Sequence, residues 1–204
     1  MGKYNAAYDR LYETAADQQG YFTTKQAIAA GYADNVHSFH VKAGNWIREH
    51  RGIYRLAKYP LGDHPDMMQW YLWSRDRNDA PQGVYSHETA LSFHDLSDIN
   101  PPKLHMTVPP RFRRAGEIPR ILVLHRGLLH QDDIENVQGF RITKPLRTLA
   151  DLLIARTMQM DHMAQGVKQA FQRGLVTRSQ LERAAQIPDP IKREIEQLRD
   201  QRRG

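Results

Sequence analysis

The sequence contains no cysteine, which excludes disulfide bonds and thiolate metal sites. No apolar stretch approaches the roughly 18 residues that a helix needs to span a bilayer. The first residues, MGKYNAAYDRLYE, lack the apolar segment of a secretory signal. We therefore expect a cytoplasmic protein that has no membrane partner.

The motifs of several enzyme classes are also missing. The sequence has no glycine-rich phosphate-binding loop and no nucleophile elbow. Ser86, His87 and Glu88 are sequence neighbours, so they cannot easily converge as a catalytic triad. We expect the Ser86–His87 pair to fix a corner between a strand and a helix that Ser86 caps.

What is present is a globular composition with an excess of positive charge. The 204 residues can form one large or two small domains, and a hydrophobic content of 40% is enough for ordinary cores. The formal net charge of +6 suits a polyanionic partner, although an acidic protein or a membrane surface would also suit it. The charge permits nucleic-acid binding but does not establish it.

Residues 21–59 have the pattern of a helix-turn-helix. Thr23 can cap a first helix, Gln26 completes a capping box three residues later, and Gly31 supplies a left-handed exit. Asp34 can then cap a second helix, because Asp is a favoured N-cap residue. This order predicts two short helices separated by a tight turn.

The second helix is predicted to end at Gly44 and to present two different faces. At 3.6-residue spacing, the face expected to pack inward consists of Val36, Phe39, His40 and Ala43. The opposite face consists of Asn35, Ser38, Val41 and Lys42. These groups are short or polar and can reach base edges and phosphates in a major groove. We interpret this helix as a recognition helix.

A two-stranded ribbon follows, as in the wing of a winged helix. Residues 46–48 and 53–56 have strand character, and Arg51-Gly52 forms the turn between them. From Lys42 to Lys58 the segment carries one acid, Glu49, against Lys42, Arg48, Arg51, Arg55 and Lys58. Because each neutralised phosphate contributes counterion release, this charge favours DNA binding over a purely structural or protein-binding winged helix.

The chain is predicted to divide after the wing, where residues 58–65, KYPLGDHP, are rich in turn formers. We expect an α+β protein with a winged helix-turn-helix domain at residues 1–60 and a mixed α/β domain at residues 61–204. The first domain should begin with a helix that ends at Gly20. In the second we expect a small sheet with strands near residues 104–108, 121–124, 134–137 and 140–143, and helices near residues 66–75, 86–91, 145–156, 161–173, 177–185 and 190–203.

Three segments carry a resemblance to a known family. They are YFTTKQAIAAGY with WIREHRGIYRLAKYP, then VYSHETALSFHDLSD with KLHMTVP, and then ITKPLRTLADLL. In this order, and over about residues 4–154, the chain resembles the AbiEi antitoxins of bacterial abortive-infection toxin-antitoxin systems. The resemblance implies a winged-helix domain that represses its own operon by binding promoter repeats, joined to a C-terminal domain that counteracts a toxin.

The resemblance also implies partners and contact residues. The partners are double-stranded DNA and a toxin, which in this family is typically a nucleotidyltransferase-like protein. By similarity, the DNA contacts map to Thr24, Lys25, Asn35, Ser38, Lys42, Arg48 and Arg51, and we add Arg55 from the same basic segment. The alternative is an antitoxin that acts through protein contacts alone, without specific DNA binding.

A second basic cluster lies between Lys103 and Arg126, where Glu117 is the only acid. Its centre is formed by Arg111, Arg113 and Arg114, which we take as a candidate second contact surface. The alternative is a solvated hairpin loop between two strands. The sequence favours neither interpretation.

A magnesium-dependent nuclease is the least favoured function. Such a domain needs an acid followed by a Glu-x-Lys triplet on adjacent strands, and near Asp132, Asp133 and Glu135 the lysine is missing. His37 and His40 have the spacing of helical metal ligands, but no carboxylate completes a set. We therefore expect no catalytic residue, no metal ligand and no cofactor.

Overall fold

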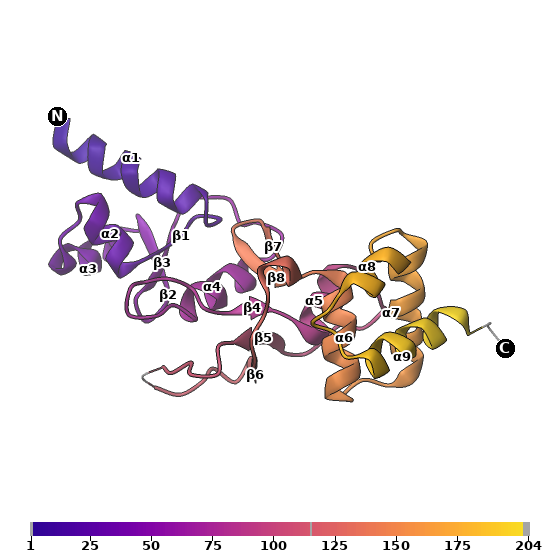
Figure 1. Ribbon diagram of the computed structural model, residues 1–204. Coiled ribbons are helices and arrows are strands. Elements are labelled where there is room, and N and C mark those ends of the chain that lie inside the picture. The colour runs from indigo at the N-terminus through magenta and orange to yellow at the C-terminus, as the bar shows by residue number, and fades with distance from the viewer. Residues whose placement is uncertain (1, 115, 202–204) are drawn as a thin grey trace. The chain divides into compact units, whose positions relative to one another are not determined.

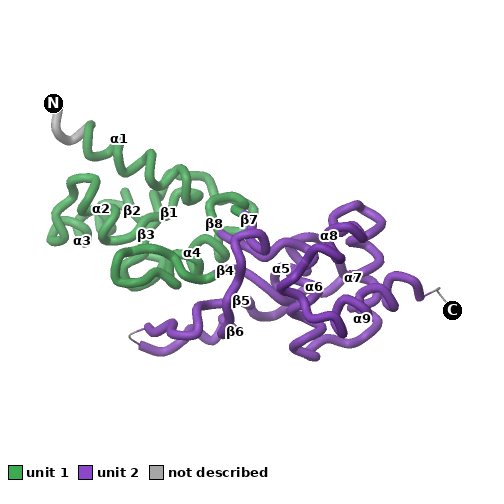
Figure 2. The backbone as a smooth tube through the Cα atoms, in the orientation of Figure 1, with its two compact units in different colours: residues 1–83, 136–140 green, residues 84–135, 141–204 purple. Residues whose placement is uncertain are grey.

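The computed structural model describes residues 2–114 and 116–201. The chain forms two compact units, shown in different colours in Figure 2. The first unit comprises residues 1–83 and 136–140, and the second comprises residues 84–135 and 141–204. The fold is α+β, as the sequence predicted.

The first unit is a winged helix-turn-helix, preceded in the chain by one additional helix and followed by another (Figure 1). Its helices are α1 (Gly2–Ala16), α2 (Thr24–Ala30), the 3-10 turn η1 (Asp34–Val36), α3 (His37–Lys42) and α4 (Pro65–Trp73). Its strands are β1 (Tyr21–Thr23), β2 (Trp46–His50) and β3 (Ile53–Leu56). The strands form an antiparallel sheet in the order β1-β3-β2.

Local signals in the sequence fix the ends of α2. Thr23 accepts a hydrogen bond from the Gln26 backbone N–H at 3.2 Å, and the Gln26 side chain accepts one from the Thr23 N–H at 2.8 Å. Gly31 ends the helix with a φ of 112°, a conformation that costs glycine little. The predicted capping box and exit are therefore confirmed.

The prediction that Asp34 caps the next helix was wrong. Asp34 is the first residue of η1, and its side chain makes no capping hydrogen bond to α3. The chain takes one 3-10 turn before the six residues of α3. Since 3-10 turns have about three residues per turn, this insertion changes the faces that later residues present.

The core of the first unit is aromatic. Phe22 of β1 lies edge-on to Trp46 with ring centroids 4.9 Å apart, and it stacks on Tyr54 at 5.8 Å. Leu11 of α1 and Ala27 of α2 are buried in the same cluster. Each large side chain removed from water in this way contributes roughly 1.5–3 kcal/mol. The strand β1, which carries Phe22, was not predicted from the sequence.

The first unit extends beyond the expected boundary at residue 60. Residues 58–64 have neither helix nor strand, as predicted, but α4 then packs against β1 and β3. Arg75, just after α4, pairs with Asp79 at 2.9 Å and donates to the Gly52 carbonyl at 3.1 Å. Thr23 donates to the Asp79 carboxylate. These contacts explain why the division falls at Gly83 and not directly after the wing.

The second unit combines a sheet with a helical cluster. Its helices are α5 (His87–Phe93), the 3-10 turn η2 (Gln131–Asp133), α6 (Pro145–Ala155), α7 (Met160–Gln172), α8 (Arg178–Arg183) and α9 (Asp189–Asp200). Its strands are β4 (Val84–Tyr85), β5 (Leu104–Val108), β6 (Leu122–Arg126), β7 (Ile134–Val137) and β8 (Phe140–Thr143). Residues 136–140 of the β7–β8 hairpin group with the first unit.

The sheet has the order β6-β5-β4-β8-β7. β5 pairs antiparallel with β4 and parallel with β6, and β4 pairs parallel with β8. The predicted strands are all present. The loop between β5 and β6, however, cannot be the hairpin loop that we considered, because a hairpin joins antiparallel strands.

The helices α6 to α9 lie together (Figure 1) and share one hydrophobic core. Pro145 occupies the first turn of α6, where its missing N–H has no helical partner to lose. Thr177 and Gln180 form a capping box on α8, as predicted. The apolar side of α9 is also buried as expected, through Ile191, Ile195 and Leu198.

Candidate nucleic-acid interface

The helix α3 buries two histidines and exposes short polar groups. His37 is 3% exposed and His40 is 8% exposed, whereas Asn35 of η1, Ser38 and Lys42 are exposed. The outward side of the helix-turn-helix therefore offers an amide, a hydroxyl and an ammonium group. These are donors and acceptors that can contact base edges and phosphates.

The inward face of α3 differs from the predicted one. Phe39, expected inside, is 64% exposed, and Ala43 is exposed as well. His37 is buried in its place, and Val41 packs partly against the core. The 3-10 turn before α3 rotates the helix relative to a continuous 3.6-residue pattern, which the sequence spacing could not reveal.

Aromatic stacking holds α3 on the core. The His40 ring stacks on Trp46 with centroids 4.7 Å apart, and the His37 ring lies 5.3 Å from Trp46. Burial lowers the pKa of His40 below its ordinary value, so this ring is neutral at pH 7. The two histidines are therefore packing residues. They are not free ligands on the helix surface.

The wing presents two arginines on a well-supported ribbon. Arg48 on β2 and Arg51 at the turn are exposed. Gly52 completes the turn with a φ of 69°, and its carbonyl accepts hydrogen bonds from Arg75 at 3.1 Å and from the Thr24 N–H at 3.1 Å. The wing turn is thus fixed to the start of α2 and to the segment after α4.

Arg55, which we expected among the DNA contacts, points into the unit. It is 8% exposed, and its Nε lies 2.8 Å from Glu49 Oε1. A buried and paired guanidinium is not available to a phosphate, so this burial argues against Arg55 as a contact. The exposed positive charge of the segment is carried by the residues outside this pair: Lys42, Arg48, Arg51 and Lys58.

Thr24 and Lys25 lie at the start of α2. Thr24 is half-buried beside the wing turn, and Lys25 is exposed. The Lys25 ammonium donates to the Arg77 carbonyl. Both residues therefore lie on the same unit as α3 and the wing, with Lys25 the more accessible of the two.

The basic loop of the second unit comprises residues 109–121. Its described residues have neither helix nor strand, Arg111 and Arg113 are exposed, and Arg114 is half-buried. Arg126 of β6 donates to the carbonyls of Pro110 at 2.9 Å and Phe112 at 3.0 Å. The three arginines lie on one loop, as their closeness in the sequence implied, but this loop has neither helix nor strand among its described residues.

Of the acids considered for a nuclease, Asp133 is buried and paired, whereas Asp132 is exposed and Glu135 is half-buried. Asp133 is 4% exposed, lies 3.1 Å from the Arg147 guanidinium, and accepts a hydrogen bond from Gln186 at 2.6 Å. Among the described residues, no group of three or more histidine and acidic side chains could hold a metal ion. Asp133 therefore has the surroundings of a structural ion pair.

Ser86 does not cap α5 through its side chain, contrary to expectation. Its hydroxyl instead accepts a hydrogen bond from Thr107 at 2.8 Å and lies 2.9 Å from His87 Nδ1. His87 has a φ of 53°, which is uncommon for a residue with a side chain. The expected role of the Ser86–His87 pair, at the corner between β4 and α5, agrees with this geometry.

One protein family matches the segment that contains the helix-turn-helix. Residues 9–57, which run from α1 to the end of β3, match a family described as a transcriptional regulator, the AbiEi antitoxin. The resemblance to AbiEi antitoxins is confirmed over these residues. The AbiEi-like segment contains all the candidate DNA contacts of the first unit, and the role described for its family is a regulatory one.

A solved structure has a similar fold over most of the chain. It is the crystal structure of the RV2827C protein from Mycobacterium tuberculosis, with a TM-score of 0.59 and 12% sequence identity. The alignment covers 95% of this chain and 76% of that one. At this identity the likeness concerns the fold alone. Among curated proteins, no sequence matches the chain.

Among the residues that the structure describes, no helix is both long enough and apolar enough to cross a bilayer.

Proposed function

We propose that the first unit binds duplex DNA and that the protein represses transcription. α3 would lie in the major groove, where Asn35, Ser38 and Lys42 reach base edges and phosphates. Arg48 and Arg51 of the wing would meet phosphate or the minor groove. The observation that carries the proposal is the common exposure of these five side chains on one helix-turn-helix, whose family is one of transcriptional regulators.

The finer proposal concerns the target and the partner. We expect the DNA to be the protein's own promoter repeats, so that the protein controls its own operon in the cytoplasm. The toxin is expected to be a nucleotidyltransferase-like protein. Support for both comes from the resemblance of residues 9–57 to AbiEi antitoxins and from the family segments in the sequence up to residue 154.

The first test is the fluorescence anisotropy of a labelled duplex from upstream of the reading frame, against a scrambled duplex of equal length. Specific binding should exceed binding to the scramble by roughly a thousandfold at physiological salt. Repeating both titrations at a second salt concentration separates specific contacts from simple charge attraction. Equal and equally salt-sensitive binding to both duplexes would contradict the proposal.

Point variants then test the site. Lys42→Ala and Arg51→Ala should each weaken specific binding by about 1 kcal/mol or more without unfolding the protein. A matched control is Arg193→Ala on α9, which removes the same charge from an exposed position outside the AbiEi-like segment. Unchanged affinity in the Lys42 and Arg51 variants would reject the assignment of the site.

The antitoxin activity needs a separate test, because an antitoxin can act through protein contacts alone. We expect the protein to co-purify with the product of the neighbouring reading frame and to restore growth when that product is expressed. The Lys42→Ala variant should still restore growth if toxin binding does not use α3. Failure of the unaltered protein to restore growth would remove the antitoxin part and leave the DNA-binding part standing.

A further inference from the structure

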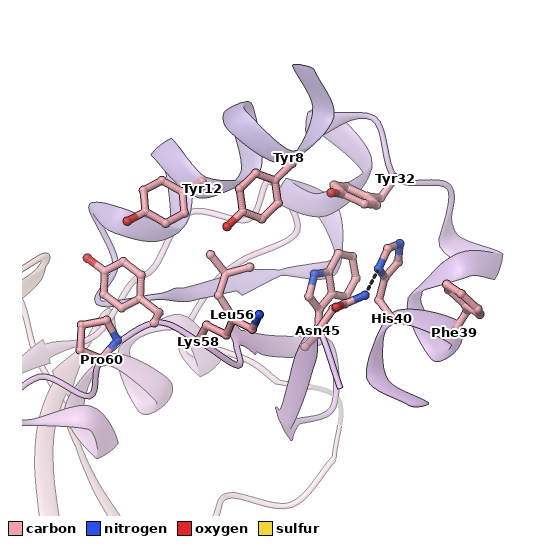
Figure 3. Close-up of a pocket in the computed structure, with 11 residues that line it drawn as sticks. Tyr8, Tyr12, Tyr32, Phe39, His40, Asn45, Leu56, Lys58 and Pro60 are labelled. Carbon is pink, nitrogen blue, oxygen red and sulfur yellow. Dashed lines mark hydrogen bonds between the residues drawn. The ribbon is translucent and has the colours of Figure 1, made fainter. Parts of the chain in front are cut away.

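The first unit contains an aromatic cavity beside α3. Its volume is about 510 Å³, within the range of small-molecule sites. One wall is formed by Tyr8 and Tyr12 of α1, which point across the cavity in Figure 3. The other wall is formed by Leu56 at the end of β3 and by the segment that follows it, including Lys58 and Pro60.

The exposed aromatic side chains converge on this cavity. Among the large hydrophobic side chains of the described residues, the exposed aromatic ones are Tyr8 at 50%, Tyr12 at 44% and Phe39 at 64%, and all three line it. The Tyr12 ring lies 5.9 Å from Tyr8 and 6.0 Å from Tyr59. Apolar rings gathered at one concave site, and not scattered over the surface, are typical of a surface that another molecule covers.

A glycine keeps this wall open and in place. Gly20, after α1, has a φ of 86°, and a Cβ at this position would lie 2.6 Å from the Tyr59 ring. The Tyr59 hydroxyl donates to the Ala16 carbonyl at 3.4 Å. The Tyr59 ring is therefore held against the end of α1, at one side of the cavity.

The charge of the lining selects among ligands. Among the described residues that line the cavity, Lys58 is the only charged one. Its ammonium repels a cation and attracts an anion. We propose that the cavity binds a small planar aromatic carboxylate, whose ring lies among Tyr8, Tyr12 and Tyr59 and whose carboxylate pairs with Lys58.

The ligand would also contact the proposed recognition helix. Phe39 and His40 of α3 line the cavity, and His40 Nδ1 lies 3.4 Å from the Asn45 amide after the helix. A ligand that contacts these side chains better in one position of α3 than in another shifts the helix toward that position. This regulatory consequence rests on the proposed DNA binding, whereas the binding of the carboxylate does not.

The test is calorimetric titration of the full chain with 1-naphthoate. Two further probes separate the parts of the proposal: neutral 1-naphthalenemethanol keeps the ring, and cyclohexanecarboxylate keeps the charge without aromaticity. We expect 1-naphthoate to bind about tenfold more tightly than either, because it alone uses both the stacking rings and the ammonium. Absence of binding by 1-naphthoate, or equal binding of all three, would overturn the proposal.

Variants locate the binding. Tyr12→Ala should weaken 1-naphthoate about tenfold, and Lys58→Met should weaken 1-naphthoate but not 1-naphthalenemethanol. Both side chains are exposed, so folding is retained and can be checked by circular dichroism. The control is Ile28→Ala, an exposed apolar residue of α2 outside the cavity. Equal losses in the Tyr12 and Ile28 variants would reject the site.

Two additional measurements distinguish a small-molecule site from a self-association surface and test its link to DNA. Sedimentation of the unaltered protein and of Tyr12→Ala shows whether this face joins two copies of the chain; a dimer that the substitution dissociates would overturn the small-molecule proposal. Anisotropy of the upstream duplex with saturating 1-naphthoate tests the regulatory consequence, with a severalfold change in Kd expected. If no duplex binds, the calorimetric result still decides the cavity on its own.

Discussion

The two units both carry an exposed basic segment, but they support it differently. In the first unit Arg48 and Arg51 lie on a ribbon whose turn is hydrogen-bonded to Arg75 and Thr24. In the second unit Arg111 and Arg113 lie on a loop whose described residues have neither helix nor strand. Charges on a rigid ribbon can hold a protein in register on a duplex, whereas charges on an irregular loop add mainly general attraction.

The histidines of the two units have different neighbours. In the first unit His40 stacks on Trp46, so its neighbour is an apolar ring. In the second unit His125 stacks on His87 at 3.5 Å, and its Nε2 lies 3.1 Å from His105 Nδ1. Burial lowers the pKa values of all three imidazoles, so their charged forms are disfavoured in the folded state. The second unit should therefore be the more sensitive to acid.

Removing the aromatic core of the first unit should have the largest effect. Phe22→Ala deletes a fully buried ring, and we expect a loss of about 3–5 kcal/mol in the free energy of unfolding, together with loss of specific DNA binding. Chemical denaturation and anisotropy measure the two effects. The matched variant Phe112→Ala removes a buried ring of the basic loop. An equal loss of DNA affinity in that variant would break the comparison between the segments.

The second largest effect should be the loss of stability of the second unit in acid. Burial and the neighbouring histidines lower the pKa of His87 to about 3, and burial lowers those of His105 and His125. Above the unfolded-state pKa of about 6.5 both states are neutral. Below it, only the unfolded state binds protons readily, so stability is lost as the pH falls from there toward the folded-state pKa.

The size of this acid effect can be measured by denaturation at a series of pH values. For His87 alone we expect a loss of about 2 kcal/mol near pH 5 relative to neutral pH. His87→Gln should flatten the profile, because the unfolded state then gains one proton fewer. A profile that is unchanged by this substitution would show that His87 does not contribute to the loss of stability in acid.

Neutralising the wing should have a smaller effect, confined to DNA binding. Arg48→Ala combined with Arg51→Ala is expected to weaken binding by about 1–2 kcal/mol and to reduce the slope of log K against log salt by about one to two. Because both side chains are exposed, unfolding should be unaffected. An unchanged slope would mean that the wing does not meet phosphates.

The same substitution in the loop should have the smallest effect. We expect Arg111→Ala combined with Arg113→Ala to change the salt slope by less than about one and the affinity by less than about 0.5 kcal/mol, since these arginines do not lie on a hydrogen-bonded ribbon as Arg48 and Arg51 do. Anisotropy under the conditions used for the wing gives a direct comparison. A change as large as that of the wing variant would make the loop a second DNA contact.

Much of the fold followed from short-range patterns. The capping pairs Thr23–Gln26 and Thr177–Gln180, the exit at Gly31 and the first-turn Pro145 placed helix ends correctly because each acts within a few residues of itself. The alternation in Leu104–Val108 likewise identified a strand that is buried toward its end. Such signals need no knowledge of distant parts of the chain.

The candidate site was predictable only in part. The sequence located the basic segment and the ribbon, and Asn35, Ser38, Lys42, Arg48 and Arg51 are all exposed as a contact surface requires. The sequence did not reveal that Arg55 turns inward to Glu49. The sequence gives the charge of a side chain. The direction in which the Arg55 side chain points depends on which face of β3 the rest of the unit covers.

The sequence by itself determined the helix-turn-helix, the wing, the charge between residues 42 and 58, and the AbiEi resemblance. Only the tertiary structure decided the rotation of α3, the third strand β1, the addition of α4 to the first unit, and the contact among His87, His105 and His125. The physical reason is the distance along the chain over which each kind of interaction acts. Caps, turns and periodicity act over a few residues, whereas burial and strand pairing join residues that are distant in the chain and select between local patterns that are equally allowed.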